Sequence, residues 1–317
     1  MINIDDLKKK LQDLYEYNRG RQADLLIENI PLKVYGGFTE NGFIRVSFAS
    51  KTKPPVIKGT KLINIESGTN KNFHFIFFEI QENTNKEVFI SFIEDVLKSS
   101  VDTKTESDFF IKLKDRFTVW KSMFVRKQKM DESLYIGLFG ELLILKKIMI
   151  PKLGISNSIQ AWGGPDDHCK DFTFSEKWIE VKTTSTNSNS IKISSLSQLS
   201  GEKNGYLSIV SYEKYTIEAT TTALSLYDLV MQVYDFIPSL TDKKCFIDKL
   251  SDYGYDFNQD NLEFKLKVHS INFYEINSEF PRLTQNDILF PQITKISYEI
   301  NIDSISCFKV KESVLFD

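Results

Sequence analysis

The stretch that decides the fold reads Asp171-Phe-Thr-Phe-Ser-Glu-Lys-Trp-Ile-Glu180-Val-Lys182. It contains two short runs, 172–174 and 178–183, whose aromatic and β-branched residues favour extended strands. The polar residues Ser175 and Glu176 lie between the runs and leave room only for a tight turn. The stretch therefore predicts a β-hairpin whose turn is centred between these two residues.

The register of this hairpin decides which side chains share a face of the sheet. The centred turn places Asp171 directly opposite Glu180, and side chains across an antiparallel pair point to the same side. Alternation along the strand brings Lys182 to that side as well. The other side carries the apolar residues Phe172, Phe174, Ile179 and Val181, with Phe172 facing Ile179. Because a slip by one residue would destroy this separation, the register predicts two carboxylates and an amine on one face and a hydrophobic core on the other.

This combination of charged groups indicates a metal site that acts on phosphodiesters. Two neighbouring carboxylates repel each other unless a cation lies between them, and hard oxygen ligands suit Mg²⁺ or Mn²⁺. A nearby lysine can orient or activate a water and offset charge on a scissile phosphate. Asp171 and Glu180 are therefore candidate metal ligands, and both, with Lys182, are candidate catalytic residues. The alternative is that Glu-x-Lys is only an exposed charged strand edge, which is the common outcome for an isolated match.

A second aspartate is an alternative ligand. The literal Pro-Asp pair is Pro165-Asp166, with Asp167 beside it. Asp166 lies five residues before Asp171, a distance of roughly 16 Å in an extended chain. A loop could return it to the site, but the hairpin register favours Asp171.

Glu141 is a third candidate catalytic carboxylate. It is the only charged residue between Leu134 and Leu145, a stretch that has the composition of a buried helix. A buried, unpaired carboxylate is costly, so a metal or a lysine is expected beside it, and Glu141 would bind the metal or orient a water. The alternative is a glutamate that reaches solvent from the edge of its helix.

Three polar residues are weaker candidates for substrate binding. Gln198 follows the predicted third strand at 191–194, and Lys192 lies on it beside Ser194. Lys170 directly precedes the first acid. A solvated helix start explains Gln198 equally well.

The composition places the chain among ordinary globular proteins. It has 317 residues, 41% hydrophobic and 26% charged, with a net charge of −3. Its three cysteines are too few for a closed four-cysteine zinc site and indicate a reducing, cytoplasmic setting. No apolar run reaches the roughly 18–20 residues that span a bilayer. The net charge neither favours nor excludes nucleic-acid binding, because only one face need be basic.

The pattern along the chain predicts an α/β protein in three parts. These are a β-rich N-terminal domain at 1–104, a core at 105–235 with one mixed sheet flanked by helices, and a C-terminal α+β region at 236–317. Helices are expected at 4–18, 87–97, 109–124, 134–148, 196–199, 224–236 and 245–250. Strands are expected at 30–35, 42–49, 61–65, 73–78, 172–174, 178–183, 191–194, 206–212, 264–276 and 293–305.

Four motifs resemble a known family. They are Gly137-Leu-Phe-Gly-Glu-Leu-Leu-Ile-Leu145, Trp162-Gly-Gly-Pro, Lys170-Asp-Phe172 and Ile179-Glu-Val-Lys-Thr-Thr184. Together they resemble an uncharacterised bacterial family of PD-(D/E)XK nucleases, which have the restriction-endonuclease-like fold. This sequence has Lys170 where a histidine is expected before the aspartate, and the acids themselves are intact.

The resemblance implies an Mg²⁺-dependent endonuclease that hydrolyses double-stranded DNA, in a restriction or phage-defence setting. It leaves a non-catalytic DNA-binding or scaffold subunit of a defence complex as the alternative, and RNA as an alternative substrate. A homodimer is expected if both strands are cut. Because the chain has no P-loop sequence, any ATPase must be a separate partner.

Overall fold

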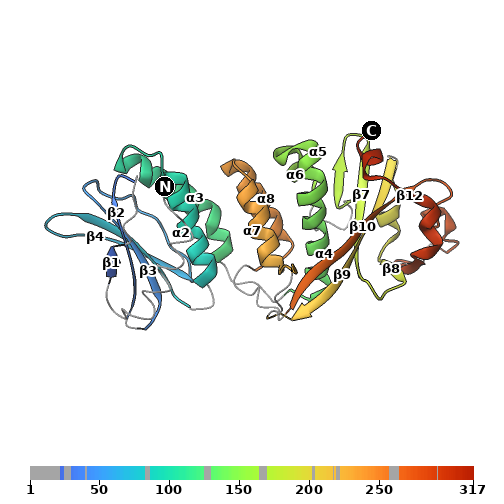
Figure 1. Ribbon diagram of the computed structural model, residues 1–317, viewed down its shortest axis with the longest axis horizontal. Helices are drawn as coiled ribbons and strands as arrows, with labels where there is room; N and C mark the ends of the chain where they lie inside the picture. Colours follow the sequence, from blue (N-terminus) through green and yellow to red (C-terminus); the bar gives the residue numbers. More distant parts are fainter. Residues whose placement is uncertain are drawn as a thin grey trace. The chain divides into compact units, whose positions relative to one another are not determined.

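The computed structural model describes residues 22–24, 30–39, 41–82, 86–124, 130–163, 170–201, 204–216, 218, 222–256, 264–290 and 292–317 (Figure 1). The predicted helix at 4–18 lies outside these residues. The chain divides into two compact units, one of residues 1–128 with 256–259, the other of residues 129–255 with 260–317. No described helix is long and apolar enough to cross a membrane.

The first unit is an antiparallel sheet with two helices. Its strand order is β1-β2-β3-β5-β4. The strands are β1 (Gln22–Asp24), β2 (Lys33–Phe38), β3 (Ile44–Ser50), β4 (Ile63–Thr69) and β5 (His74–Ile80). The helices are α2 (Lys86–Ser100) and α3 (Glu106–Trp120), and the 3-10 helix η2 (Lys121–Phe124) follows. These elements confirm the four strands and two helices predicted between residues 30 and 124, with shifted ends.

Aromatic rings fill the space between this sheet and its helices. Phe78 of β5 lies 5.5 Å from Phe92 of α2 and 5.6 Å from Phe117 of α3, measured between ring centroids. Asp95 of α2 accepts hydrogen bonds from the Trp120 indole nitrogen (2.8 Å) and the Arg116 guanidinium (3.2 Å), which ties the two helices together. Alternate residues of each strand point into this core, so the other face of the sheet has a different composition.

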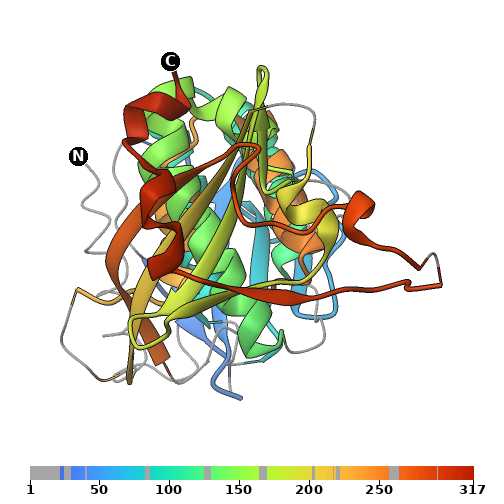
Figure 2. The ribbon, with the colours of Figure 1, turned by 90° about the vertical axis from the view of Figure 1, so that its right-hand side faces the viewer.

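The second unit contains a mixed sheet in the order β12-β10-β9-β7-β6. Its strands are β6 (Phe172–Phe174), β7 (Lys177–Ser185), β9 (Asn204–Thr216), β10 (Phe264–Ile276) and β12 (Lys309–Val310). Only the β7–β9 pair is parallel; the other pairs are antiparallel. The long strands β9 and β10 cross the unit in Figure 2. The expected mixed sheet is therefore confirmed.

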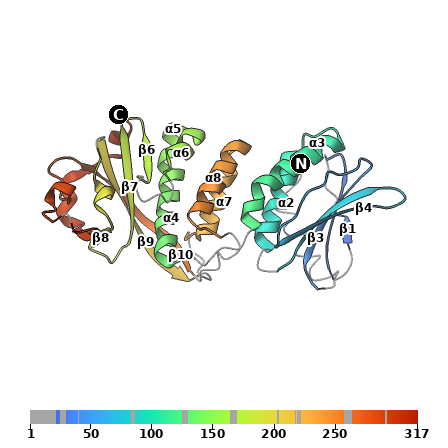
Figure 3. The ribbon, with the colours of Figure 1, turned by 180° about the vertical axis from the view of Figure 1, so that it is seen from behind.

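Helices cover one face of this sheet. The α-helices are α4 (Glu132–Ile144), α5 (Ile150–Leu153), α6 (Ile155–Ala161), α7 (Leu226–Phe236) and α8 (Leu240–Asp252). A π-helical segment, η3 (Leu145–Met149), continues α4. Helix α4 packs against β7 on one side and α7 on the other, as Figure 3 shows.

The other face is covered by a separate two-stranded sheet. Strand β8 (Ser190–Ile193) pairs with β11 (Tyr298–Asn301). The short helices η4 (Leu196–Leu199), η5 (Gln285–Asp287), η6 (Asp303–Phe308) and η7 (Glu312–Leu315) accompany it. Ile191, Ile193 and Ile300 pack with Trp178 and Leu207 of the mixed sheet. The mixed sheet is thus buried on both faces.

Two predicted strands need correction. The strand expected at 191–194 does not join the mixed sheet, because its two isoleucines pack onto that sheet from outside while Lys192 faces solvent. The strand expected at 293–305 spans only 298–301. Asn301 ends it by accepting a hydrogen bond from the Ser304 backbone (3.1 Å), which starts a 3-10 helix.

The three-part division at residues 104 and 235 stays a proposal. Strands β10 and β12, which follow residue 235, pair into the same sheet as β7 and β9. The hairpin of interest is therefore part of a sheet whose strands come from residues 172 to 310.

Candidate active site

The hairpin forms in the predicted register. Phe172 pairs with Ile179 and Phe174 with Lys177, across a turn in which Ser175 has a φ of +48°. This confirms the register inferred from the alternation of side chains. Both apolar partners, Phe172 and Ile179, are completely buried, so burial of this face fixes the hairpin against a slip.

Asp171 directly precedes β6 and is tied across the hairpin to β7. Its Oδ2 accepts a hydrogen bond from the Val181 backbone nitrogen at 2.6 Å. Its own carbonyl accepts one from the Gly163 nitrogen at 2.8 Å, and Trp162 bridges to Phe172. Asp171 is therefore held in place through its carboxylate on one side and through its backbone carbonyl on the other. The alternatives Asp166 and Asp167 lie outside the described residues.

Glu180 and Lys182 form a buried ion pair on β7. Lys182 Nζ donates to Glu180 Oε1 at 2.9 Å, and the two side chains are 15% and 3% exposed. Burial raises the pKa of Glu180, and the positive charges of Lys182 and Lys170 oppose that rise. Because Glu180 is almost completely buried, the alternative that Glu-x-Lys is only an exposed charged strand edge does not apply to this chain.

Gly140 of α4 brings the helix onto β7. A β-carbon at Gly140 would lie 1.8 Å from Thr183 Oγ1, which overlaps that atom, and 3.1 Å from Thr183 Cβ, which is a tight contact. Gly137, one turn earlier, has nothing within 4 Å of such a position. The close approach at Gly140 places the next residue, Glu141, against the sheet beside the hairpin acids.

Glu141 is buried and doubly hydrogen-bonded. Its Oε2 accepts from Trp162 Nε1 at 2.8 Å and from the Tyr253 hydroxyl at 2.5 Å. The Trp162 and Tyr253 rings are stacked, with centroids 5.6 Å apart and planes 12° from parallel. Burial raises the pKa of Glu141 to about 7, and the charge of Glu180 adds to the rise. The predicted buried position of Glu141 is confirmed, but its immediate partners are neutral donors rather than a lysine.

Three carboxyl groups therefore influence one another in this region. Burial raises the pKa of Asp171 well above its usual range, and Glu141 and Glu180 raise it further. The interaction energy of like charges grows as they leave water. Asp171, Glu180, Lys182 and Glu141, which the sequence singled out, are thus brought together.

Lys170 contacts the backbone of η4 and a ring of β7, and its role in substrate binding stays a prediction. Its Nζ donates to the carbonyls of Ser197 and Gln198, the latter at 3.0 Å, and lies 3.9 Å from the centre of the Trp178 ring. Burial lowers its pKa to about 8, while Glu180 and Asp171 act in the opposite direction. Lys170 therefore fastens η4 beside the site and adds positive charge near the acids.

The remaining weak candidates lie near η4 and on β8. Gln198 is half-buried, and its Oε1 accepts from the Ser194 backbone nitrogen at 2.7 Å. Lys192 is exposed on β8, and the structure gives it no contact with Asp171 or Glu180 within the described part of the chain. A substrate role for either residue stays a prediction.

The donor set fits a cation held by two carboxylates. Asp171 uses Oδ2 for the Val181 backbone, and Glu180 uses Oε1 for Lys182. Each keeps a second oxygen for which no other hydrogen bond is found among the described residues. No three His, Cys, Asp or Glu side chains in the described ranges are arranged to hold one ion. Because Mg²⁺ keeps several waters and commonly uses one or two carboxylates, a pair such as Asp171 and Glu180 is compatible in number and chemistry with this ion.

The raised pKa of Glu141 predicts a pH-dependent stability for the metal-free protein. The folded state favours the protonated carboxyl, so this stabilisation is full below the ordinary value of 4.5 and is lost as pH rises through about 7. The loss is roughly 3 kcal/mol, since a tenfold change in proton affinity is worth about 1.4 kcal/mol. Urea unfolding in EDTA between pH 4 and 8 measures it.

The matched control for this prediction is on the same helix. Glu141→Gln should reduce the pH dependence and leave the part that the raised pKa values of Asp171 and Glu180 contribute, whereas Glu132→Gln, at an exposed position in the first turn of α4, should leave it as in the wild type. Equal slopes for Glu141→Gln and the wild type would contradict the assignment.

Comparison with known proteins gives one match. A family model described as "Putative PD-(D/E)XK family member, (DUF4420)" matches residues 8–303. Neither a curated protein nor a solved structure matches the chain significantly.

Proposed function

The chain belongs to this PD-(D/E)XK family, and from that premise we propose that it is a divalent-metal-dependent endonuclease. The observation that carries the proposal is the placement of Asp171, Glu180 and Lys182 on one buried hairpin with Glu141 beside it. A chain rarely places three carboxyl groups near one another with two of them buried, because each raises the cost of ionising the others. A divalent cation would remove that cost.

The carboxylates and the lysine of the hairpin would have different chemical roles. Asp171 and Glu180 would hold Mg²⁺, or Mn²⁺ in its place. When bound, the cation would act as a Lewis acid toward the phosphodiester. Lys182 would orient the attacking water and offset charge that develops on the scissile phosphate.

Glu141 would assist from α4. Its pKa is raised in the metal-free protein, and once the cation lowers the cost of ionisation its carboxylate would bind the metal or orient a water at the site. Trp162 and Tyr253 would hold its Oε2 in position while this happens.

We further propose double-stranded DNA as the substrate and a cytoplasmic restriction or phage-defence setting. A homodimer would supply the two active sites that two-strand cleavage needs. A separate ATPase or defence-complex partner would supply any translocation. The non-catalytic scaffold alternative predicts neither metal binding nor cleavage.

The proposal is tested by cleavage assays with purified full-length protein. The wild type is incubated with plasmid DNA, phage DNA, single-stranded DNA and RNA, each with Mg²⁺, Mn²⁺ or EDTA. We expect cutting of double-stranded DNA with either metal and none in EDTA. Preferential cutting of RNA would keep the chemistry and overturn the DNA assignment.

The acids are tested in the same assay. Asp171→Asn and Glu180→Gln should abolish cutting and also the thermal stabilisation by Mg²⁺. Glu176→Gln, in the exposed turn of the same hairpin, should retain both. No cutting and no Mg²⁺-dependent shift of the wild type would instead favour the scaffold alternative.

A further inference from the structure

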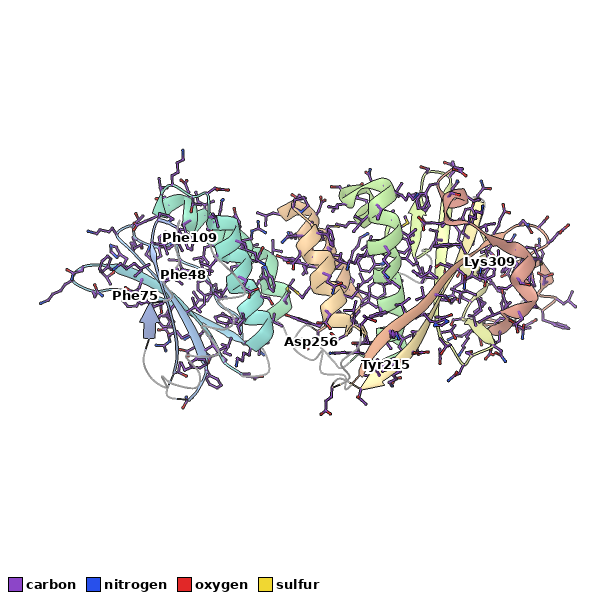
Figure 4. All side chains as sticks on the ribbon, viewed as in Figure 1. Phe48, Phe75, Phe109, Tyr215, Asp256 and Lys309 are labelled. Carbon is purple, nitrogen blue, oxygen red and sulfur yellow. The ribbon has the colours of Figure 1, made fainter. Side chains whose placement is uncertain are left out.

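The sheet of the first unit has a hollow on the face that its helices do not cover. Helices α2 and α3 pack on one face, where Phe48, Phe78 and Phe109 are completely buried (Figures 1 and 4). Among the described residues, no helix lies on the other face. A trough of about 800 Å³ lies there, lined by residues of β2, β3 and β5 and by the β4–β5 turn.

Small side chains form the floor of this trough and aromatic side chains form its walls. Ser47 of β3 pairs with Tyr35 of β2 on one side and with Phe77 of β5 on the other. In the next row, Ala49 of β3 pairs with Phe75 of β5. Paired residues point to the same face, so the small residues of β3 lie between rings carried by its neighbours.

Phe75 lies across the adjacent strand rather than over the trough. A β-carbon at Gly68 of β4 would be 2.4 Å from Phe75 Cζ and 2.8 Å from Cε2. Because Gly68 has no side chain, the Phe75 ring can pack directly against the backbone of β4. Since the ring does not fold back over Ala49, the trough stays open.

A fixed polar pair borders the aromatic wall. The Arg45 guanidinium lies 4.5 Å from the centre of the Phe77 ring, and its Nε donates to Glu79 Oε2 at 2.7 Å. A second guanidinium nitrogen, Nη2, contacts the same Glu79 oxygen, and the Arg45 side chain is 35% exposed. The pair thus offers donors and an acceptor at the edge of a ring surface.

A second cation lies beside an aromatic residue that lines the trough. The Lys51 ammonium is 5.9 Å from the centre of the Phe73 ring, and Phe73 lines the trough. The Lys51 backbone nitrogen is held by the Glu106 carboxylate at 3.0 Å. Positive charge therefore stands next to aromatic rings at two separate places.

We propose that this trough binds a nucleotide that is unpaired in the nucleic acid on which the protein acts, which in double-stranded DNA is a nucleotide flipped out of the duplex. A nucleobase has flat apolar faces and polar edges, which match the rings of Tyr35 and Phe77 and the Arg45–Glu79 pair. Lys51 would contact the adjoining phosphate. The volume is within the range of small-ligand sites. The inference rests on the proposed function only in taking nucleic acid as the substrate.

Binding is measured with full-length wild-type protein in EDTA, so that cleavage does not interfere. The probe is a fluorescently labelled single-stranded oligonucleotide, and fluorescence anisotropy gives its Kd. We expect Phe77→Ala and Arg45→Gln each to weaken binding by about 5- to 100-fold, the range that loss of one base stack produces. An oligonucleotide of the same length with abasic sites should bind the wild type as weakly as the intact one binds Phe77→Ala.

The control variant is Ile111→Ala. Ile111 is a 60% exposed apolar residue on α3, on the helix side of the same unit, and its replacement should leave Kd unchanged. Thermal melts check that every variant is folded, and the half-exposed Arg45 provides a second test if Phe77→Ala unfolds. Unchanged Kd in folded Phe77→Ala or Arg45→Gln would overturn the proposal.

Two further results separate this inference from the nuclease proposal. Weakened binding by the trough variants, in a wild type that cuts nothing, would support the trough and overturn the nuclease. Cutting by the wild type with equal Kd for all variants would overturn the trough alone. A dimer that Phe77→Ala converts to a monomer, with Kd unchanged, would assign the face to contacts between two copies of the chain and also overturn the proposal.

Discussion

Lys182→Ala is expected to reduce metal-dependent cleavage by at least ~100-fold, the effect of removing one preorganised charge from a reacting phosphate. Lys182 contacts Glu180 at 2.9 Å and is only 15% exposed, so water cannot replace its ammonium group. Because both proposed metal ligands remain, Mg²⁺ should still raise the melting temperature of the variant. The measurement is the initial rate of plasmid cutting beside the Mg²⁺-dependent thermal shift.

The control for Lys182→Ala is Lys214→Ala. Lys214 lies on β9 of the same sheet and pairs with Glu132 at 2.7 Å, with both side chains largely exposed. Such surface pairs contribute little to stability, so cutting should stay at the wild-type rate. If Lys182→Ala cuts at that rate too, then Lys182 does not act in the reaction.

Gly140→Ala is expected to destabilise the protein by about 1–3 kcal/mol or more, the range for overpacking a core. The added methyl would overlap Thr183 Oγ1, so α4 must move away from β7. That movement would carry Glu141 away from the hairpin acids and lower the cleavage rate of the molecules that still fold. Urea unfolding gives the stability, and cleavage per folded molecule gives the second effect.

Gly137→Ala and Thr183→Ala test the cause of this destabilisation. Gly137 is on the same helix with open space beside it. Alanine there should leave the free energy of unfolding unchanged or raise it by roughly 0.5–1 kcal/mol. Thr183 Oγ1 is buried and has no hydrogen-bond partner among the described residues, so Thr183→Ala should be tolerated. The Gly140→Ala/Thr183→Ala double variant should recover part of the loss, because the overlapping oxygen is gone. No recovery would show that the close approach is not the reason for glycine.

Local patterns predicted the hairpin well. Its register follows from a strict alternation of apolar and charged residues around Ser175, and burial of Phe172 and Ile179 enforces it. Strand 264–276 was predicted to the residue, because apolar residues recur along it between polar ones and it contains no Gly or Pro. The burial of Glu141 followed from the apolar residues around it.

Contacts between distant segments could not be predicted in this way. The Tyr253 hydroxyl reaches Glu141 across 112 residues, and nothing in the residues around Tyr253 marks it as a partner. Trp162 lies in a motif that the sequence did single out, but its bond to Glu141 depends on where α4 packs. The alternation at 191–194 is that of a sheet strand, and only tertiary packing decides which sheet it joins.

The separation of Glu141 and Tyr253 in sequence also has a consequence for folding during synthesis. When the ribosome has incorporated Lys182, the nascent chain contains the four residues assigned to the reaction. It does not yet contain Tyr253 or β10. The nascent chain then lacks both the donor that holds Glu141 and the strand that pairs with β9 along twelve positions. Because contacts so distant in sequence form late, cleavage competence should arise only when synthesis is almost complete. If the protein cuts DNA as proposed, this order of synthesis would leave the cell's DNA uncut while the chain is being translated.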